Sequence, residues 1–199
     1  MQGGLAARYG IFYLGIWGST VDFGRAATPS GKTVEVADVE IDWYGGARKT
    51  WRGLDWGLGA YYSSYPGAFA ENLDYLELHV RLSKTIFDKL TIKLTDFWSP
   101  NYSGDVGPVD VVELAADYTF DTWWIFDPSV SALVGGQFGR EDVEDLNYAY
   151  WNAGLTLGLH RWPAFSLDLR FWDTNLSACA QASVFQCGER LVGSFNAEF

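Results

Sequence analysis

The chain has little of what most enzymes and helical membrane proteins need. Its 199 residues include only two histidines, two cysteines and one methionine, so a His-based hydrolytic site or a zinc site lacks parts. No apolar run approaches the roughly 18 residues of a membrane helix, and no segment sustains apolar spacing of three and four. A P-loop, a nucleotide-binding glycine pattern and a serine-hydrolase elbow are absent from the sequence. We therefore expect no enzyme, no metal and no cofactor, and helix as a minor component at most.

Basic residues are also scarce. Lys and Arg number 14 against 25 Asp and Glu, which gives a formal net charge of -11 and argues against nucleic acid as a partner. The mean hydropathy of -0.05 is that of an ordinary soluble domain, but a membrane β-barrel also averages to neutrality because its two faces alternate. The length predicts a single domain over residues 1–199.

Aromatic residues are abundant, at 17% with ten Trp. Membrane interfaces place amphipathic rings at headgroup level on both sides of the bilayer. Sugar-stacking platforms are the alternative, but such a site would explain one cluster only. We expect the rings at strand ends to form two interface girdles, made of Trp17, Trp43, Trp56, Trp98, Trp123, Trp124, Trp151 and Trp162.

Strict alternation marks the end of the chain. Leu191, Gly193, Phe195, Ala197 and Phe199 point one way and a mostly polar set points the other, as in the closing strand of a bacterial outer-membrane barrel. We expect Phe195 and Phe199 to serve as the signal that the barrel-assembly machinery reads.

Similar alternating segments recur along the whole chain and predict an all-β, antiparallel, up-and-down barrel. About eleven strands are expected, near residues 3–8, 11–19, 34–47, 55–65, 75–85, 90–98, 109–120, 129–139, 147–159, 165–174 and 190–199. Alternation does not tell which face is inside, because a soluble barrel or sandwich shows it with the apolar face inward.

The lengths of the connections favour a membrane barrel over a soluble one. They alternate between long ones, such as 20–33 and 175–189, and short ones, such as 48–54 and 86–89. Outer-membrane barrels have long extracellular loops and short periplasmic turns. The long side is acidic and the short side mildly basic. We therefore expect an outer-membrane location, with the lipid bilayer as a partner.

Charged residues inside the predicted strands are candidates for the lumen of a pore. Three are bases, Arg81, Lys93 and Arg170, and ten are acids, namely Glu35, Asp38, Glu40, Asp42, Glu77, Asp96, Glu113, Asp117, Asp168 and Glu198. If most of them face a water-filled lumen, it would favour cations; the alternative is that the charges pair and plug a narrow lumen. The candidates are Asp38, Glu40, Asp42, Glu77, His79, Arg81, Lys93, Glu113, Asp117, Asp168 and Arg170. His79 could be a base or metal ligand, but a hydrogen-bonded lumen histidine is favoured. Asp96 falls on the lipid side by alternation, which calls for a place at the rim or a bulge.

The two cysteines, Cys179 and Cys187, lie eight residues apart in the longest outer loop. An oxidising periplasm makes a disulfide between them the favoured state over free thiols.

Several short, mostly aromatic motifs recur along the chain, namely YLGIWGSTVDF at 13–23, YSSYPGA at 62–68, LDY at 73–75, SPNY at 99–102 and the closing segment at 190–199. Together they resemble the TorF family of porin-like outer-membrane proteins of proteobacteria. The resemblance covers nearly the whole chain and implies a channel, with no agreed substrate and no catalytic residues.

The chain departs from that family at its start. Members usually carry a signal peptide and a strand before the segment that matches residues 2–5, and Met1-Gln2-Gly3-Gly4 lacks the charged and apolar regions of a signal peptide. Since single-chain bacterial barrels have even strand numbers, we expect eleven strands of a probable twelve. The predicted function is passive passage of ions or small polar solutes, preferring cations. A non-conducting structural or adhesive barrel and a soluble carbohydrate-binding sandwich are the alternatives.

Overall fold

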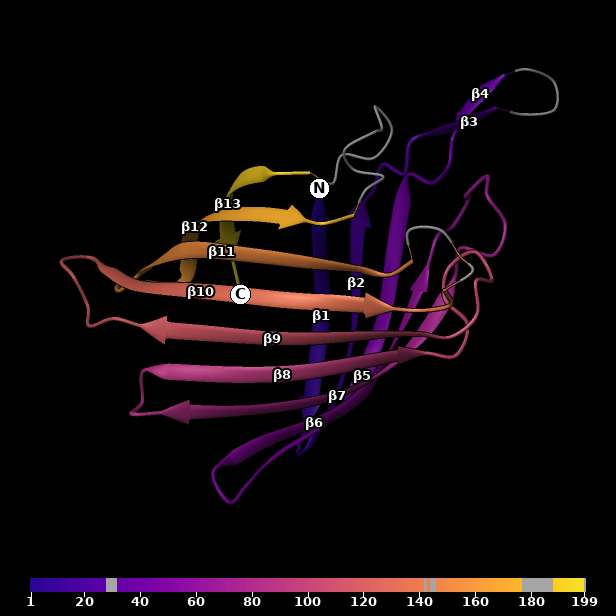
Figure 1. Cartoon of the computed structure of the whole chain (residues 1–199). Helices are drawn as coiled ribbons and strands as arrows, with labels where there is room; N and C mark the ends of the chain where they lie inside the picture. Colours follow the sequence, from indigo (N-terminus) through magenta and orange to yellow (C-terminus); the bar gives the residue numbers. More distant parts are fainter. Residues whose placement is uncertain (28–31, 142, 144–145, 177–187, 199) are drawn as a thin grey trace.

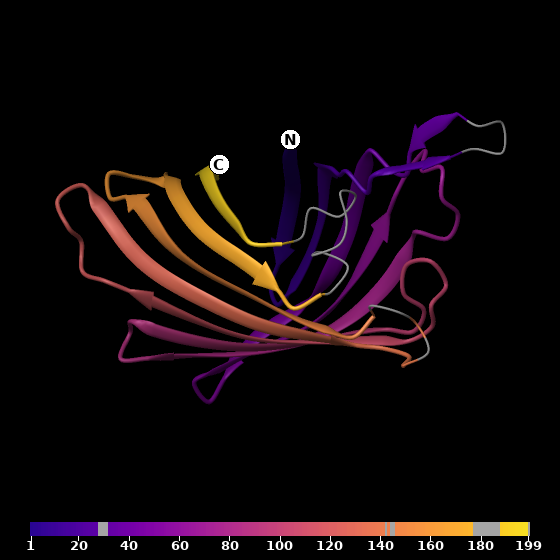
Figure 2. The same cartoon turned by 45° about the horizontal axis from the view of Figure 1, so that its top comes forward.

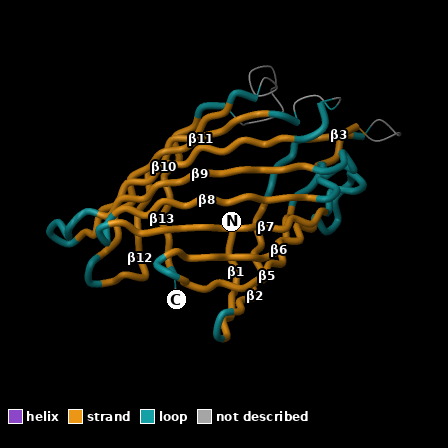
Figure 3. Tube along the Cα trace, turned by 60° about the horizontal axis from the view of Figure 1, so that its bottom comes forward, coloured by secondary structure: helices purple, strands orange, loops and turns teal. Residues whose placement is uncertain are grey.

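A computed structural model of the chain describes residues 1–27, 32–141, 143, 146–176 and 188–198. The described residues form antiparallel strands joined by loops, with no helix (Figure 3). No helix among them is therefore long and apolar enough to cross a membrane. The thirteen strands are β1 Gln2–Tyr9, β2 Phe12–Thr20, β3 Arg25–Ala27, β4 Thr33–Glu35, β5 Val39–Trp51, β6 Leu54–Ser64, β7 Tyr75–Ile86, β8 Leu90–Ser99, β9 Val109–Thr119, β10 Phe126–Phe138, β11 Tyr148–Leu159, β12 Trp162–Thr174 and β13 Arg190–Ala197.

One sheet holds eleven of these strands in the order β1-β2-β5-β6-β7-β8-β9-β10-β11-β12-β13. Within this sheet each strand pairs with the strands before and after it in chain order, which is the up-and-down topology predicted, and each predicted segment overlaps one strand of this sheet. The remaining two strands, β3 and β4, form a separate hairpin that the sequence did not reveal. Arg25 and Glu35 join its strands by an ion pair of 2.6 Å. The predicted strand 34–47 is thus wrong at its start, because Glu35 belongs to β4 and β5 begins at Val39.

Long and short connections alternate as predicted. The long ones, 21–38, 65–74, 100–108, 139–147 and 175–189, start from one end of the sheet and the short ones, 10–11, 52–53, 87–89, 120–125 and 160–161, from the other (Figure 1). The turn between β5 and β6 has φ of 54° at Arg52 and 73° at Gly53. Two successive positive φ angles define the type I′ turn, whose twist matches that of the strands it joins.

The sheet curls into a deep trough, with both chain ends at its open side (Figure 2). β1 and β13 are the two ends of the strand order, and no pairing between them occurs in the described residues. The described pairings therefore show the predicted antiparallel up-and-down sheet, curled and with an open seam between β1 and β13, and they do not show the closure of a barrel. With eleven antiparallel neighbours in a row, β1 and β13 run in the same direction, so they cannot complete the antiparallel pattern by pairing with each other.

Candidate functional site: the concave face

The polarity of the two faces is reversed relative to a soluble protein. The buried polar residues are Ser63, His79, Thr95, Ser99, Gln137 and Asn152, against four buried apolar ones. All six lie on the inside of the curl, which we call the concave face. Large apolar side chains on the opposite, outward face are exposed, such as Leu58 at 59%, Leu114 at 50% and Leu169 at 51%.

Glycines on the concave face make room for large side chains. Gly15 pairs with Tyr44 across β2 and β5, and a Cβ at Gly15 would lie 2.3 Å from Cζ of the Tyr44 ring. Gly135 has the same relation to Tyr150, again with 2.3 Å to Cζ. These close approaches require glycine, so rings from neighbouring strands cover the backbone of the concave face.

Aromatic side chains surround His79 on the concave face. The Tyr61 and Phe97 rings lie 4.9 and 5.7 Å from the His79 ring, centroid to centroid. The Tyr13 hydroxyl shares a hydrogen bond of 3.2 Å with Nε2 of His79. Nδ1 of His79 is buried, with no hydrogen-bond partner among the residues that the structure describes. The described residues contain no group of three or more His, Cys, Asp or Glu side chains that could hold a metal ion.

Carboxylates gather toward the long-loop end of the concave face. Asp42 accepts a hydrogen bond of 2.7 Å from Ser63, and Glu113 accepts one of 2.6 Å from Tyr150. Glu77 lies close enough to Asp42 and Glu113 for their charges to act on it. This acidic zone is completed by Glu40.

Tyrosines at the long-loop end stay protonated and serve as donors. Tyr65, which follows β6, donates a hydrogen bond of 2.7 Å to Glu40. Burial, together with this bond, raises the pKa of the Tyr65 hydroxyl. Burial likewise raises the pKa of Tyr102, whose ring lies 4.6 Å from that of Tyr75.

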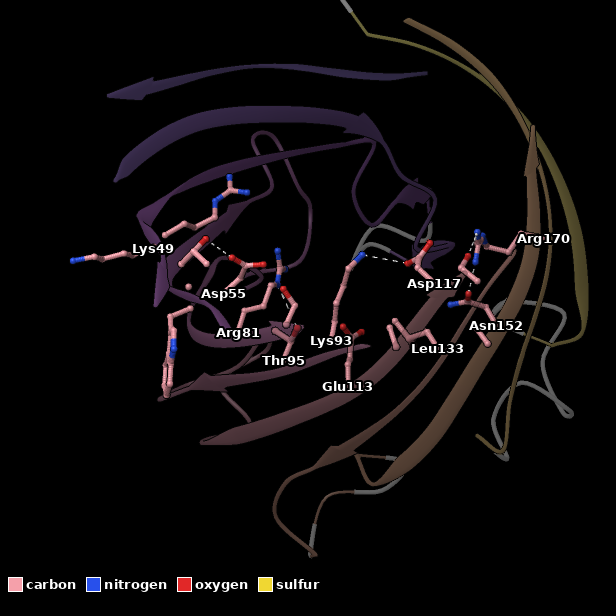
Figure 4. A pocket seen from close by; sticks show the side chains of 18 of the residues that line it. Lys49, Asp55, Arg81, Lys93, Thr95, Glu113, Asp117, Leu133, Asn152 and Arg170 are labelled. Carbon is pink, nitrogen blue, oxygen red and sulfur yellow. Dashed lines mark hydrogen bonds and ion pairs between the residues drawn. The ribbon is translucent and has the colours of Figure 1, made fainter. Parts of the chain in front are cut away.

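The short-turn half of the concave face is basic. Arg8, Arg48, Arg81 and Arg170 line a cavity of about 740 Å³ there. Lys93 also lines it and forms an ion pair of 3.2 Å with Asp117 (Figure 4). A second cavity, of about 670 Å³, lies toward the acidic zone, and Glu113 borders both. The concave face therefore carries a charge gradient along the strands, acidic near the long loops and basic near the short turns.

Arg170 is the most engaged charge of the concave face. Its guanidinium donates to Asn152 Oδ1 at 2.7 Å and to Ser131 Oγ at 2.8 Å. It also donates to the two oxygens of Asp168 at 3.2 and 3.0 Å. The second Asp168 oxygen accepts a further bond of 2.8 Å from Thr156. The network spans β10, β11 and β12 and ties their concave sides together.

Most predicted lumen residues share the concave face by strand register. They are Glu40, Asp42, Glu77, His79, Arg81, Lys93, Glu113, Asp117, Asp168 and Arg170. Asp38 is different, because it lies in an exposed bend before β5. Asp96 pairs with Val80 and Val112 on the outward face, with no register shift in β8, so the expected bulge does not occur. Asp96 lies three residues before the end of β8, and its place at the rim stays a prediction.

The sequence analysis missed two basic residues of the concave face, Arg8 and Arg48, because it counted both with the charges of the short-connection side; Arg8 ends the predicted strand 3–8, and Arg48 follows the predicted strand 34–47. β1 and β5 extend further than predicted, and the same alternation carried to Tyr9 and Trp51 would have found both. With these two residues inside, and with Glu35 and Asp96 outside, the acidic excess of the trough is smaller than ten against three.

The predicted girdle tryptophans divide between the faces. Register places Trp43, Trp56, Trp98, Trp151 and Trp162 on the outward face. Trp123 and Trp124 are exposed in the 120–125 connection. Trp17 is a correction, since it pairs with Asp42 on the concave face; Trp172, which pairs with Asn152, lies there too.

Of the two terminal phenylalanines and the two cysteines, the structure describes Phe195 alone, and the assembly signal and the disulfide stay predictions. Phe195 lies on the outward face of β13, 66% exposed and stacked on Phe165 with centroids 5.8 Å apart. Phe199, Cys179 and Cys187 lie outside the described residues.

Comparison with known proteins adds the family. The curated proteins contain no match to the chain. A family model described as a bacterial protein of unknown function, Gcw_chp, matches residues 1–195. That match covers nearly the whole sheet, from β1 to within β13. The chain belongs to the Gcw_chp family of bacterial proteins of unknown function.

Proposed function

We propose that the chain forms a barrel of the bacterial outer membrane that lets ions and small polar solutes pass, with a preference for cations. The resemblance of the short aromatic motifs to TorF porins is one reason for this proposal. The observation that carries it is the reversed polarity of the sheet, with polar residues buried on the concave face and large apolar ones exposed on the outward face.

The outward face suits hydrocarbon better than water. Soluble monomers rarely expose contiguous apolar patches beyond a few hundred Å², whereas exposed leucines occur on the outward face of four neighbouring strands here. Leu58, Leu78, Leu94 and Leu114 are each at least 43% exposed, and Leu94 pairs directly with Leu114. A sheet that hydrogen-bonds its backbone internally can cross a bilayer. The exposed tryptophans near strand ends fit the interfaces.

The concave face suits a polar route. Cavities of about 740 and 670 Å³ adjoin at Glu113 along the trough. The acidic zone at the long-loop end would raise the local concentration of cations, as rings of carboxylates do in cation channels. If the acidic zone at the long-loop end controls which ions enter the trough, the channel prefers cations.

A non-conducting barrel is the second candidate, and two features favour it. The Arg170 network and the Lys93–Asp117 pair join neighbouring strands across the concave face. The Tyr61 and Phe97 rings pack against His79 on the concave face. Small barrels are filled by side chains in this way.

Conductance in planar lipid bilayers separates the two candidates. We expect discrete steps and a reversal potential that indicates cation preference. Replacing Glu40 and Asp42 with Gln and Asn should lower the cation-to-anion permeability ratio, more strongly at low salt, where screening is weak. Asp42→Asn alone and Asp96→Asn each remove one carboxylate, the first from the concave face and the second from the outward face, and only the first should lower the ratio. An intact folded protein without steps supports the filled barrel instead.

Membrane insertion is tested separately. We expect the protein to fractionate with outer membranes and to need detergent for extraction. A protein that purifies in buffer without detergent would favour the soluble carbohydrate-binding sandwich.

A further inference from the structure

Two arginines stand side by side on the concave face with a glycine between them. Arg48 of β5 pairs with Gly57 of β6, and Gly57 pairs with Arg81 of β7. A Cβ at Gly57 would lie 3.5 Å from Cβ of Arg81 and 3.7 Å from Cγ of Arg48. Both side chains therefore rise from one row of the sheet, over a backbone position that carries no side chain.

Neither guanidinium has a carboxylate partner among the described residues. Arg48 lies over the Tyr13 ring, with Cζ 4.2 Å from the centroid. Arg81 makes one long hydrogen bond, from Nε to Thr95 Oγ1 at 3.4 Å. A guanidinium offers five N–H donors, so most donors of this pair stay available. Arg170, in contrast, donates hydrogen bonds to Asp168, Asn152 and Ser131.

The two carboxylates nearest in register are engaged elsewhere. Asp55, two residues before Gly57, accepts a hydrogen bond from Thr50. Glu113 lies in the row of Arg81 but on the far side of Thr95, and it accepts the bond from Tyr150. Two like charges that share a row repel each other, and a bound anion would relieve that repulsion.

We propose that Arg48 and Arg81 form a binding subsite for a small oxyanion, a carboxylate or a phosphate group, in the short-turn half of the trough. Both residues line the cavity of about 740 Å³, which is within the range of ligand pockets, about 300–1,000 Å³. Planar guanidinium forks match carboxylate and phosphate oxygens with two parallel hydrogen bonds. Arg8 borders the same cavity and adds positive charge.

The subsite deepens the proposed channel and rests on it for the route of access. A solute that enters from the long-loop end would meet the acidic zone first and the basic subsite second. A solute that carries both signs would meet a matching group in each zone, and a purely anionic one would have to pass the acidic zone first.

Binding to the folded protein in detergent micelles tests the subsite without any conductance. Inorganic phosphate is titrated by isothermal calorimetry at low ionic strength, with acetate and chloride in parallel arms. We expect saturable phosphate binding that weakens about tenfold in Arg48→Gln and in Arg81→Gln, since a hydrogen-bonded charge is lost in each. Acetate competition would identify a carboxylate-accepting subsite, and its absence one that takes phosphate.

Lys84→Gln is the matched control, because Lys84 lies on β7 three residues from Arg81 and pairs with Ile92 on the outward face. It should bind phosphate like the wild type. Arg81→Lys keeps the charge but not the fork and should fall between wild type and Arg81→Gln. Circular dichroism establishes that each variant is folded. Absence of saturable binding by the folded wild type, equal affinity in the Arg48→Gln/Arg81→Gln double variant, or equal competition by chloride would overturn the proposal. A protein that conducts without binding phosphate refutes the subsite alone, and one that binds phosphate without conducting refutes the channel alone.

Discussion

Removal of the Arg170 guanidinium should cost far more stability than removal of any other lumen charge. Arg170→Met leaves Asp168 with a bond from Thr156 alone and takes donors from Asn152 and Ser131. The Arg170 and Asp168 side chains are only 19% and 15% exposed. Breaking one partner of a buried pair costs about 3–5 kcal/mol. Since water reaches part of this pair, we expect the low end, about 3 kcal/mol in the free energy of unfolding.

The Lys93–Asp117 pair supplies the comparison, because its side chains are 44% and 37% exposed. Lys93→Met should cost about 0–1 kcal/mol, as for exposed pairs. Urea unfolding from lipid vesicles, followed by tryptophan fluorescence and by the heat-dependent mobility of the folded band on gels, measures both. Adding Asp168→Asn to Arg170→Met removes the unpaired carboxylate and should restore at least about 1 kcal/mol. If Arg170→Met costs no more than Lys93→Met, or if the second substitution restores nothing, the network does not hold these strands together.

Three further outcomes test the faces and the cysteines. Gly15→Val should lower stability by about 1–3 kcal/mol, because the new side chain meets the Tyr44 ring; Tyr44→Ala should rescue it, and Gly18→Ala, whose Cβ has nothing nearer than 3.9 Å, should have little effect. Asp96→Leu should raise the free energy of unfolding in lipid vesicles by about 1 kcal/mol, since a lipid-facing carboxylate is unfavourable. A lower free energy of unfolding in this variant would show that residue 96 does not face lipid. The two cysteines should resist an impermeant maleimide on intact cells until a reductant is added, and free labelling without it would exclude their disulfide.

Alternation predicted which residues share a face, but not which face is inside. Val80, Asp96 and Val112 show both points: period two placed Asp96 with apolar neighbours, and the register puts it between them on the outward face. The expectation of a rim position or a bulge came from the cost of that charge, which is an energetic argument and not a pattern. Trp17 shows the opposite error, because an aromatic ring at a strand end was assigned by type although alternation groups it with Tyr13 and Gly15.

The sequence by itself determined the antiparallel topology, the number of strands in the main sheet and the alternation of long and short connections, because each depends on residues near in the chain. The tertiary structure alone decided the rest. Gly57 brings Arg48 and Arg81 into one row, Arg170 reaches Ser131 across two strands, and β1 and β13 leave a seam. These relations depend on the register between strands and on the curl of the sheet. Each joins residues that lie far apart in the sequence, so no local pattern predicts their contact.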